Sequence, residues 1–303
     1  MFKEFDVLVI LIVLLAVAAI FKGEVFYNFS NLFAVLELSA ILGIATLGEA
    51  LVLIVRGVDL SVGALMGLAA TLAAHWIPEF GIAAAILFPL AVCGLLGLVN
   101  GLLIEKGRVP ALVATIGMMW VAGGLAGGIS NGRLIPIGNK AFENIALGSV
   151  FGVVPLFFAG LFVVAAITYV VRTNFSIGRS VYAIGGDENA AYYSAIPVAG
   201  TRIAIYCAAG ILYGIAGLLM ASYVRSGIPT AGNDYEFKAI TAAVLGGVSL
   251  TGGRGNLLNA ILGAVILIVL YGVITAFAVS PYIQGIVQGL VLVGAVFYAS
   301  RNY

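Results

Sequence analysis

Two glutamates and one asparagine stand inside long apolar stretches of this sequence, where a polar group is costly and usually serves a function. Glu37 and Glu49 are twelve residues apart in one stretch, which places their carboxylates about 120° apart around a helix. They do not share a face, so we do not expect an ion site of paired carboxylates. Asn100 lies in another stretch, among glycines. Its amide could offer hydrogen bonds to a polar solute or could join two helices.

The chain lacks the usual motifs for ATP hydrolysis and metal catalysis. No Gly-Lys pair occurs, so there is no P-loop. The single histidine, His75, leaves little scope for acid–base catalysis or a zinc site. The two cysteines lie far apart in apolar stretches, where free thiols are expected. We therefore expect no catalytic residue and no metal site, and interpret the chain as a conduit rather than an enzyme.

The elements that position these residues must lie in lipid, because the composition excludes a soluble domain. Hydrophobic residues make up 63% of the 303 residues and charged residues only 9%, against about 25% charged in soluble domains. The net charge of +1 gives no basis for nucleic acid binding. The sequence predicts an all-α polytopic integral membrane protein with one transmembrane domain over residues 1–303.

Apolar stretches long enough to cross the hydrocarbon core, which takes about twenty residues, define the predicted spans. A further stretch, 239–250, is shorter and could be a tilted span, a broken helix or a re-entrant segment. Counting it predicts about ten transmembrane helices, with both chain ends on one side. The other predicted spans are 5–21, 32–55, 61–77, 81–104, 110–130, 150–171, 203–224, 257–279 and 283–299.

The loops predict the orientation, because Lys and Arg accumulate on the cytoplasmic side. With the N-terminus inside, nine basic residues lie inside: Lys3, Arg56, Lys106, Arg108, Arg172, Arg179, Arg202, Arg254 and Arg301. Five lie outside: Lys22, Arg133, Lys140, Arg225 and Lys238. The excess favours an N-in, C-in topology. If 239–250 does not cross, the spans after it invert.

One hydrophilic loop on the predicted cytoplasmic side, 173–201, contains a helix signal of its own. Asp187 can cap a short helix from Glu188 to Ile196, which Pro197 stops. Gly185 and Gly186 before it permit a tight turn. Such a helix suits the docking of another protein, although an ordinary interhelical loop would read in the same way.

Glycine spacing predicts close helix packing. Gly123, Gly124, Gly127 and Gly128 form two GxxxG pairs, and Gly210 with Gly214 forms another. Small residues at this spacing let helix backbones approach each other in lipid. We therefore expect a compact bundle of many helices.

Two loops share the pattern G-V-x-L-[ST]-x-G, at 57–63 and 247–253. Each precedes a long apolar span, so Ser61 or Thr251 could cap the helix that follows. Transporters are often built from repeated halves. Seven positions made of common residues are weak evidence, and an internal duplication remains one interpretation.

Four stretches in series resemble the sugar-type ABC permease family, which includes ribose, xylose, galactose and autoinducer-2 permeases. They keep the order and spacing of that family from about residue 48 to 290. Ala195 stands where the family usually has glycine, and Phe237-Lys238 replaces a more usual Leu-Asp. The stretches are 56–63 (RGVDLSVG), 100–117 (NG…VPA…ATIG), 178–191 (GRSVYAIGGDENAA) and 235–255 (YEFKAI…LGGVSL…GGRG).

The resemblance implies roles for particular residues. It identifies 173–201 as a cytoplasmic coupling loop that docks an ATPase, through Gly185, Asp187, Glu188, Asn189, Ala190, Ala191 and Ile196. Candidates for the translocation path are Glu49, Asn100 and Thr115.

The resemblance also implies partners and a location. These are a cytoplasmic sugar-type ATPase that binds ATP and Mg, a second permease, identical or a paralogue, and a periplasmic or lipid-anchored sugar-binding protein. The chain itself would hold no cofactor and would lie in the bacterial inner membrane. The alternative is a stand-alone secondary transporter or a small-solute channel. The sequence does not name the sugar or the residues that contact it.

Overall fold

A computed structural model describes residues 4–301, in which twelve helices and four two-residue strands are present. The helices are α1 Glu4–Phe26, α2 Phe29–Ile54, α3 Val62–Glu105, α4 Ala111–Ser130, α5 Lys140–Leu147, α6 Leu156–Asn174, α7 Ser176–Gly186, α8 Glu188–Tyr193, α9 Val198–Val224, α10 Tyr235–Leu245, α11 Leu257–Ala276 and α12 Pro281–Arg301. The strands are β1 Ile135–Pro136, β2 Ser149–Val150, β3 Val154–Pro155 and β4 Ser226–Gly227.

Six helices of the described chain are long and apolar enough to cross a membrane: α2, α3, α4, α6, α9 and α11. A shorter apolar stretch, 282–297, lies within α12. The strands pair only as β1 with β4 and β2 with β3. The prediction of an all-helical, multi-pass membrane protein is confirmed.

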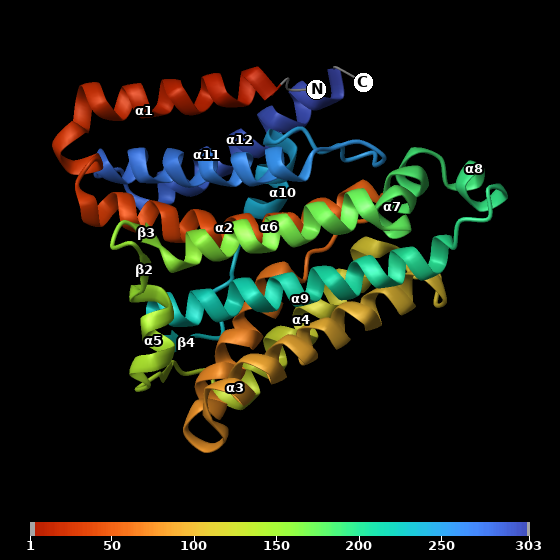
Figure 1. Cartoon of the computed structure of the whole chain (residues 1–303), viewed down its shortest axis with the longest axis horizontal. Coiled ribbons are helices and arrows are strands. Elements are labelled where there is room, and N and C mark those ends of the chain that lie inside the picture. Colours follow the sequence, from red (N-terminus) through yellow and green to blue (C-terminus); the bar gives the residue numbers. More distant parts are fainter. Residues whose placement is uncertain (1–3, 302–303) are drawn as a thin grey trace.

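Two predicted spans, 61–77 and 81–104, fall within the single helix α3. Its backbone leaves the helical region at Gly81, where φ is 75° and ψ is 178°. Only glycine adopts that conformation readily. Gly81 therefore divides α3 into two arms, and Figure 1 shows the chain reversing direction between them.

The helix α9 packs against α2 and α3 at the centre of the bundle, and glycine makes the approach close. A Cβ atom at Gly97 would overlap the carbonyl of Tyr206, and one at Gly210 would overlap the carbonyl of Cys93. The expected packing role is confirmed for the pair Gly210 and Gly214. Within residues 4–301 it does not hold for the GxxxG pairs of α4, since a Cβ at Gly123, Gly124, Gly127 or Gly128 would meet no other atom of this chain within 4 Å. The α4 glycines face outward.

The two ends of the bundle differ in what they carry. The start of α1 and the end of α12 lie at the end that bears α7 and α8 (Figure 1). The turn between α1 and α2 lies at the opposite end, with α5 and the strand pairs. The short helix α5 lies in the hydrophilic stretch 131–149, and the carbonyl of its Phe142 accepts a hydrogen bond from Ser222.

The short apolar stretch 239–250, for which the sequence allows three interpretations, is partly helical. The helix α10 covers Tyr235–Leu245, and an irregular loop follows it up to α11. Eleven residues span about 16 Å, roughly half of the hydrocarbon core. Ala239, Ala242 and Ala243 of α10 are fully buried. The structure therefore favours the broken-helix interpretation, with α10 buried among other helices.

Candidate functional site

A buried polar network surrounds the chain between α2 and α3. Within it, Asp59 Oδ1 accepts two hydrogen bonds from Ser61, at 2.8 Å from the backbone nitrogen and 2.6 Å from the hydroxyl. The backbone nitrogen of Asp59 donates to Glu49 Oε1 at 3.4 Å, and Tyr213 donates to Glu49 Oε2 at 3.1 Å. All of these side chains are fully buried. Irregular backbone at membrane depth is tolerated only when its polar groups find partners of this kind.

The other two candidates for the translocation path, Asn100 and Thr115, contact the same chain segment between α2 and α3. Asn100 Nδ2 donates to Ser61 Oγ at 3.3 Å, and Thr115 Oγ1 lies 3.5 Å from the carbonyl oxygen of Val58. Glu49, Asn100 and Thr115 thus converge on residues 55–61, and each has no exposed surface. Asn100 joins helices, in accordance with the second of its two interpretations.

The second G-V-x-L-[ST]-x-G loop repeats the turn of the first. Thr251 donates its backbone N–H to Ser249 Oγ at 3.2 Å, and the two hydroxyls are 2.8 Å apart. Asp59 and Ser61 make the same two contacts at the matching positions. The likeness therefore extends to local structure. The expected capping roles are wrong, because Ser61 makes no side-chain cap bond and Asn256 caps α11 instead.

Both of these loops meet α7 at a junction packed with glycines. Arg56 donates to the carbonyls of Gly185 and Gly186, at 2.9 and 2.7 Å. The backbone nitrogen of Gly253 donates to the carbonyl of Ile54 at 2.9 Å. A Cβ atom at Gly185 would overlap both Ile54 and Gly253. The junction therefore joins the end of α2, the end of α7 and the loop after α10.

This arrangement corrects the predicted role of two glycines. Gly185 and Gly186 belong to the last turn of α7 rather than to a tight turn before α8. Gly185 must lack a side chain because two backbones approach it. A cation at a helix C-terminus is favourable, and Arg56 satisfies carbonyls that the end of α7 leaves open.

The predicted cap at Asp187 is confirmed, but the helix that it starts is shorter than expected. Asp187 accepts from the backbone nitrogen of Ala190 at 3.0 Å, as an N-cap does. The helix α8 ends at Tyr193 and not at Ile196. Ala195 is left-handed, with φ of 60°, and Ile196 donates to the carbonyl of Ala191. This is a Schellman ending, which stops the helix before Pro197.

The predicted coupling residues divide between two faces. Gly185 and Ala191 are buried and Ile196 is partly buried, whereas Asp187, Glu188, Asn189 and Ala190 are exposed. The structure adds two tyrosines to this surface. Tyr192 is 70% exposed and Tyr193 is 86% exposed. The exposed side of α8 is thus polar with two adjacent tyrosines.

An ion-pair bridge ties α8 to the bundle. Arg202 of α9 pairs with Glu188 at 2.8 Å and also with Glu105 at the end of α3. Beside it, the hydroxyl of Tyr182 donates to the carbonyl of Gly255 at 3.0 Å. Burial raises the pKa of Tyr182, so this hydroxyl stays protonated and able to donate. Movement of α7 or α8 therefore bears directly on α3, α9 and the loop before α11.

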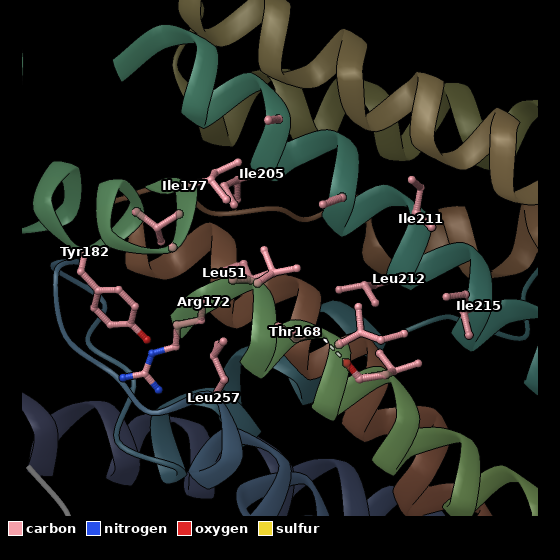
Figure 2. A pocket seen from close by; sticks show the side chains of 17 residues that line it. Leu51, Thr168, Arg172, Ile177, Tyr182, Ile205, Ile211, Leu212, Ile215 and Leu257 are labelled. Carbon is pink, nitrogen blue, oxygen red and sulfur yellow. Dashed lines mark hydrogen bonds between the residues drawn. The ribbon is translucent and has the colours of Figure 1, made fainter. Parts of the chain in front are cut away.

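Two hollows of different chemistry lie away from the network. One is an apolar groove of about 330 Å3 between α6, α7 and α9, with Arg172 and Tyr182 together at one end (Figure 2). The other is a polar pocket of about 450 Å3 between α2, α10, α11 and α12. Polar side chains that line this pocket include Asn31, Asp234, Lys238, Tyr271, Gln284 and Gln288.

The stretch Gly128–Gly132 matches the G-x-S-x-G pattern of hydrolases, but its geometry differs from theirs. Ser130 lies in the last turn of α4 and not on a strand-to-helix turn. Its hydroxyl donates to the carbonyl of Ala126 at 2.8 Å, within its own helix. Ser130 is therefore a helix residue satisfied by its own backbone.

Comparison with known proteins identifies the family. Residues 31–296 match the sequence model of the family described as branched-chain amino acid transport system / permease component. The ribose import permease protein RbsC of Escherichia coli (strain K12) is 35% identical, with 97% of this chain and 93% of the relative covered. The galactose/methyl galactoside import permease protein MglC of the same strain is 33% identical, with 99% and 95% covered.

A third relative and the solved structures complete the comparison. The probable ABC transporter permease protein y4mJ of Sinorhizobium fredii is 34% identical, with 89% of this chain and 80% of the relative covered. No solved structure matches the chain. The resemblance drawn from the motifs is confirmed, and the chain belongs to this family of transport-system permease components, whose members include import permeases for ribose and galactose.

Proposed function

We propose that this chain is the membrane-spanning subunit of an ATP-driven importer for a neutral sugar. The observation that carries the proposal is near full-length similarity to import permeases for ribose and galactose. A separate cytoplasmic ATPase binds ATP and Mg and supplies the energy. A second permease, identical or a paralogue, completes the pathway, and an extracytoplasmic binding protein delivers the sugar.

The proposed topology has ten crossings with both chain ends in the cytoplasm. They are α1, α2, the two arms of α3, α4, α6, α9, the segment 228–245 that includes α10, α11 and α12. An even number of crossings agrees with both described ends lying beside α7 and α8 (Figure 1). In this topology α8 is cytoplasmic, and the excess of Lys and Arg lies inside.

The coupling mechanism follows from the glycine junction. The ATPase docks on the exposed side of α8 through Asp187, Glu188, Asn189 and Ala190, next to the two tyrosines. Closing of the ATPase moves α7, and Gly185 transmits the motion to the end of α2 and to the loop after α10. The end of α2 and the loop after α10 therefore move together. ATP inside and the loaded binding protein outside bias the two states of the path.

Glu49, Asn100 and Thr115 act on the path indirectly in this mechanism. Their hydrogen bonds hold residues 55–61, from which α3 starts. They keep the start of α3 in a fixed position relative to α2 and α4. These residues position the path rather than line it.

The docking role is tested with Asn189→Arg, since Asn189 is exposed and lies outside the hydrogen bonds of α8. The permease is reconstituted with its ATPase, and ATP hydrolysis stimulated by the loaded binding protein is measured. A bulky cation on the docking face should abolish the stimulation. The same change at Asn174, which is exposed at the end of α6 on the same side of the bundle but outside α8, is the control. Full stimulation of the Asn189 variant would show that the ATPase docks elsewhere.

The alternative function, a stand-alone secondary transporter or channel, differs from the proposed one in its energy source. Proteoliposomes with the permease alone are compared with those containing its ATPase, using labelled D-ribose and D-galactose. The proposal expects uptake only with the ATPase and ATP. Uptake driven by an ion gradient without the ATPase would establish the alternative.

A further inference from the structure

The polar pocket between α2, α10, α11 and α12 has the chemistry of a solute site in the membrane. Its walls come from the first half of α2, the start of α10, the second half of α11 and the first half of α12. Asn31 lies in the first turn of α2, at the end of the bundle away from α8 (Figure 1). Asp234 and Lys238 lie where the half-length helix α10 begins. The pocket therefore extends from one end of the bundle to the break in a span.

The polar groups of the pocket differ in their partners. Asn31 donates to the carbonyl of Phe26 at 2.8 Å, and Gln284 donates to the hydroxyl of Thr275 at 3.4 Å. The hydroxyl of Tyr271 is buried and has no hydrogen-bond partner within residues 4–301. Lys238 forms no ion pair among the described residues and lies over the rings of Tyr235 and Tyr271, at 4.9 and 5.9 Å. A buried polar group normally pairs, so the unpaired hydroxyl of Tyr271 beside a cavity points to a ligand.

The mixture of polar side chains in the lining indicates the chemistry of the ligand. The lining offers amides, hydroxyls, one cation and one anion, which together both donate and accept. Sugar hydroxyls need this combination, because each of them donates and accepts. An anionic ligand would need an excess of cations, and the described residues hold no cluster of acidic, histidine and cysteine side chains for a metal. The tyrosine rings add apolar faces for the C–H groups of a sugar ring.

We infer that this pocket is the site through which the transported sugar passes, held by Tyr271, Lys238 and Gln288 among others. The inference rests on the proposed function and names side chains that would contact the sugar. The apolar groove of Figure 2 is the contrasting case, because Thr168, Arg172 and Tyr182 are its only polar side chains. Its surface suits hydrocarbon.

The test compares two tyrosines that differ in their partners. Tyr271→Phe removes a hydroxyl that no protein group uses, whereas Tyr213→Phe removes one bonded to Glu49. The reconstituted transporter is assayed with labelled D-ribose and D-galactose for sugar taken up per ATP hydrolysed, together with its melting temperature. Tyr271→Phe should keep the melting temperature and lower the uptake ratio by about 2- to 10-fold, the value of one lost hydrogen bond. Tyr213→Phe should lower the melting temperature.

Two results would overturn the inference in a working transporter: an unchanged uptake ratio in Tyr271→Phe, or a melting temperature that falls as far as in Tyr213→Phe. If the unaltered transporter takes up neither sugar, the proposed function fails, and a labelling experiment then decides on the pocket alone. Thr275→Cys places a thiol in the lining of the pocket, and Thr168→Cys places one in the lining of the apolar groove. Both are made with Cys207→Ser, since Cys93 is buried, and treated with a membrane-impermeant maleimide. A solute pocket requires labelling at 275 and none at 168; equal labelling, or none, contradicts it.

Discussion

Two polar regions lie within the apolar bundle, and they differ in what surrounds their polar groups. Around residues 55–61, Glu49, Asp59, Ser61 and Asn100 hydrogen-bond to one another or to nearby backbone and have no exposed surface. Asp59 Oδ2 and Asn100 Oδ1 have no partner within residues 4–301, so this network is enclosed but not fully paired. In the pocket beside α10, the unpaired hydroxyl belongs to Tyr271, which lines a cavity. Polar residues in a membrane protein thus support irregular chain between helices when they bond mainly to one another, and provide a site when they line a cavity.

The comparison of the two regions predicts its largest effect when one aspartate from each region is replaced by alanine and the losses of stability are compared. Asp59→Ala leaves the N–H and the hydroxyl of buried Ser61 without their acceptor, which should cost about 3 kcal/mol of unfolding free energy. Asp234→Ala changes an exposed residue at the pocket and should cost under about 1 kcal/mol. The melting temperatures of the two purified variants check this. Equal losses would remove the distinction between support and site.

The glycine junction predicts the next effect, with a neighbouring residue as its control. Gly185→Ala introduces a Cβ that overlaps the backbone of Ile54 and Gly253, whereas a Cβ at Gly186 meets nothing within 4 Å. Overpacking of this kind costs about 2 kcal/mol. We expect Gly185→Ala to lower the melting temperature and the stimulated ATP hydrolysis, and Gly186→Ala to change both much less. Similar behaviour of the two variants would mean that the junction is not tightly packed.

The sequence predicts those features that depend on local pattern. Apolar length alone places α2, α4, α9 and α11 to within a few residues, because lipid imposes a fixed length on a span. The cap at Asp187 follows from residue type and the apolar-to-polar change around it. The sequence predicts the end of α8 three residues too late, because Pro197 marks a stop while the left-handed turn at Ala195 ends the helix earlier.

Features that depend on distant contacts could not be read from the sequence. Gly124 and Gly128 have the same spacing as Gly210 and Gly214, yet only the second pair packs against a helix of this chain. The spacing contains no information on which face meets a neighbour. The polar pocket draws its lining from four helices, so that no short motif contains all of it. Lys238 stood out only as a departure from the family pattern.

The smallest predicted effect concerns the residue at which the sequence departs from its family beside the coupling helix. Ala195 adopts φ of 60° at the position where a Schellman ending favours glycine. Ala195→Gly removes the strain of the left-handed conformation, about 1 kcal/mol, but increases the entropy of the unfolded chain, which leaves a net gain of about 0.5 kcal/mol. Hydrogen exchange of the amide of Ile196, which bonds to Ala191 across this turn, should slow by about twofold.

Ala190→Gly, within α8, should accelerate exchange of the same amide, because glycine weakens a helix interior by about 1 kcal/mol. Unchanged exchange in both variants would mean that α8 is held by Arg202 and its ion pairs rather than by its own ending.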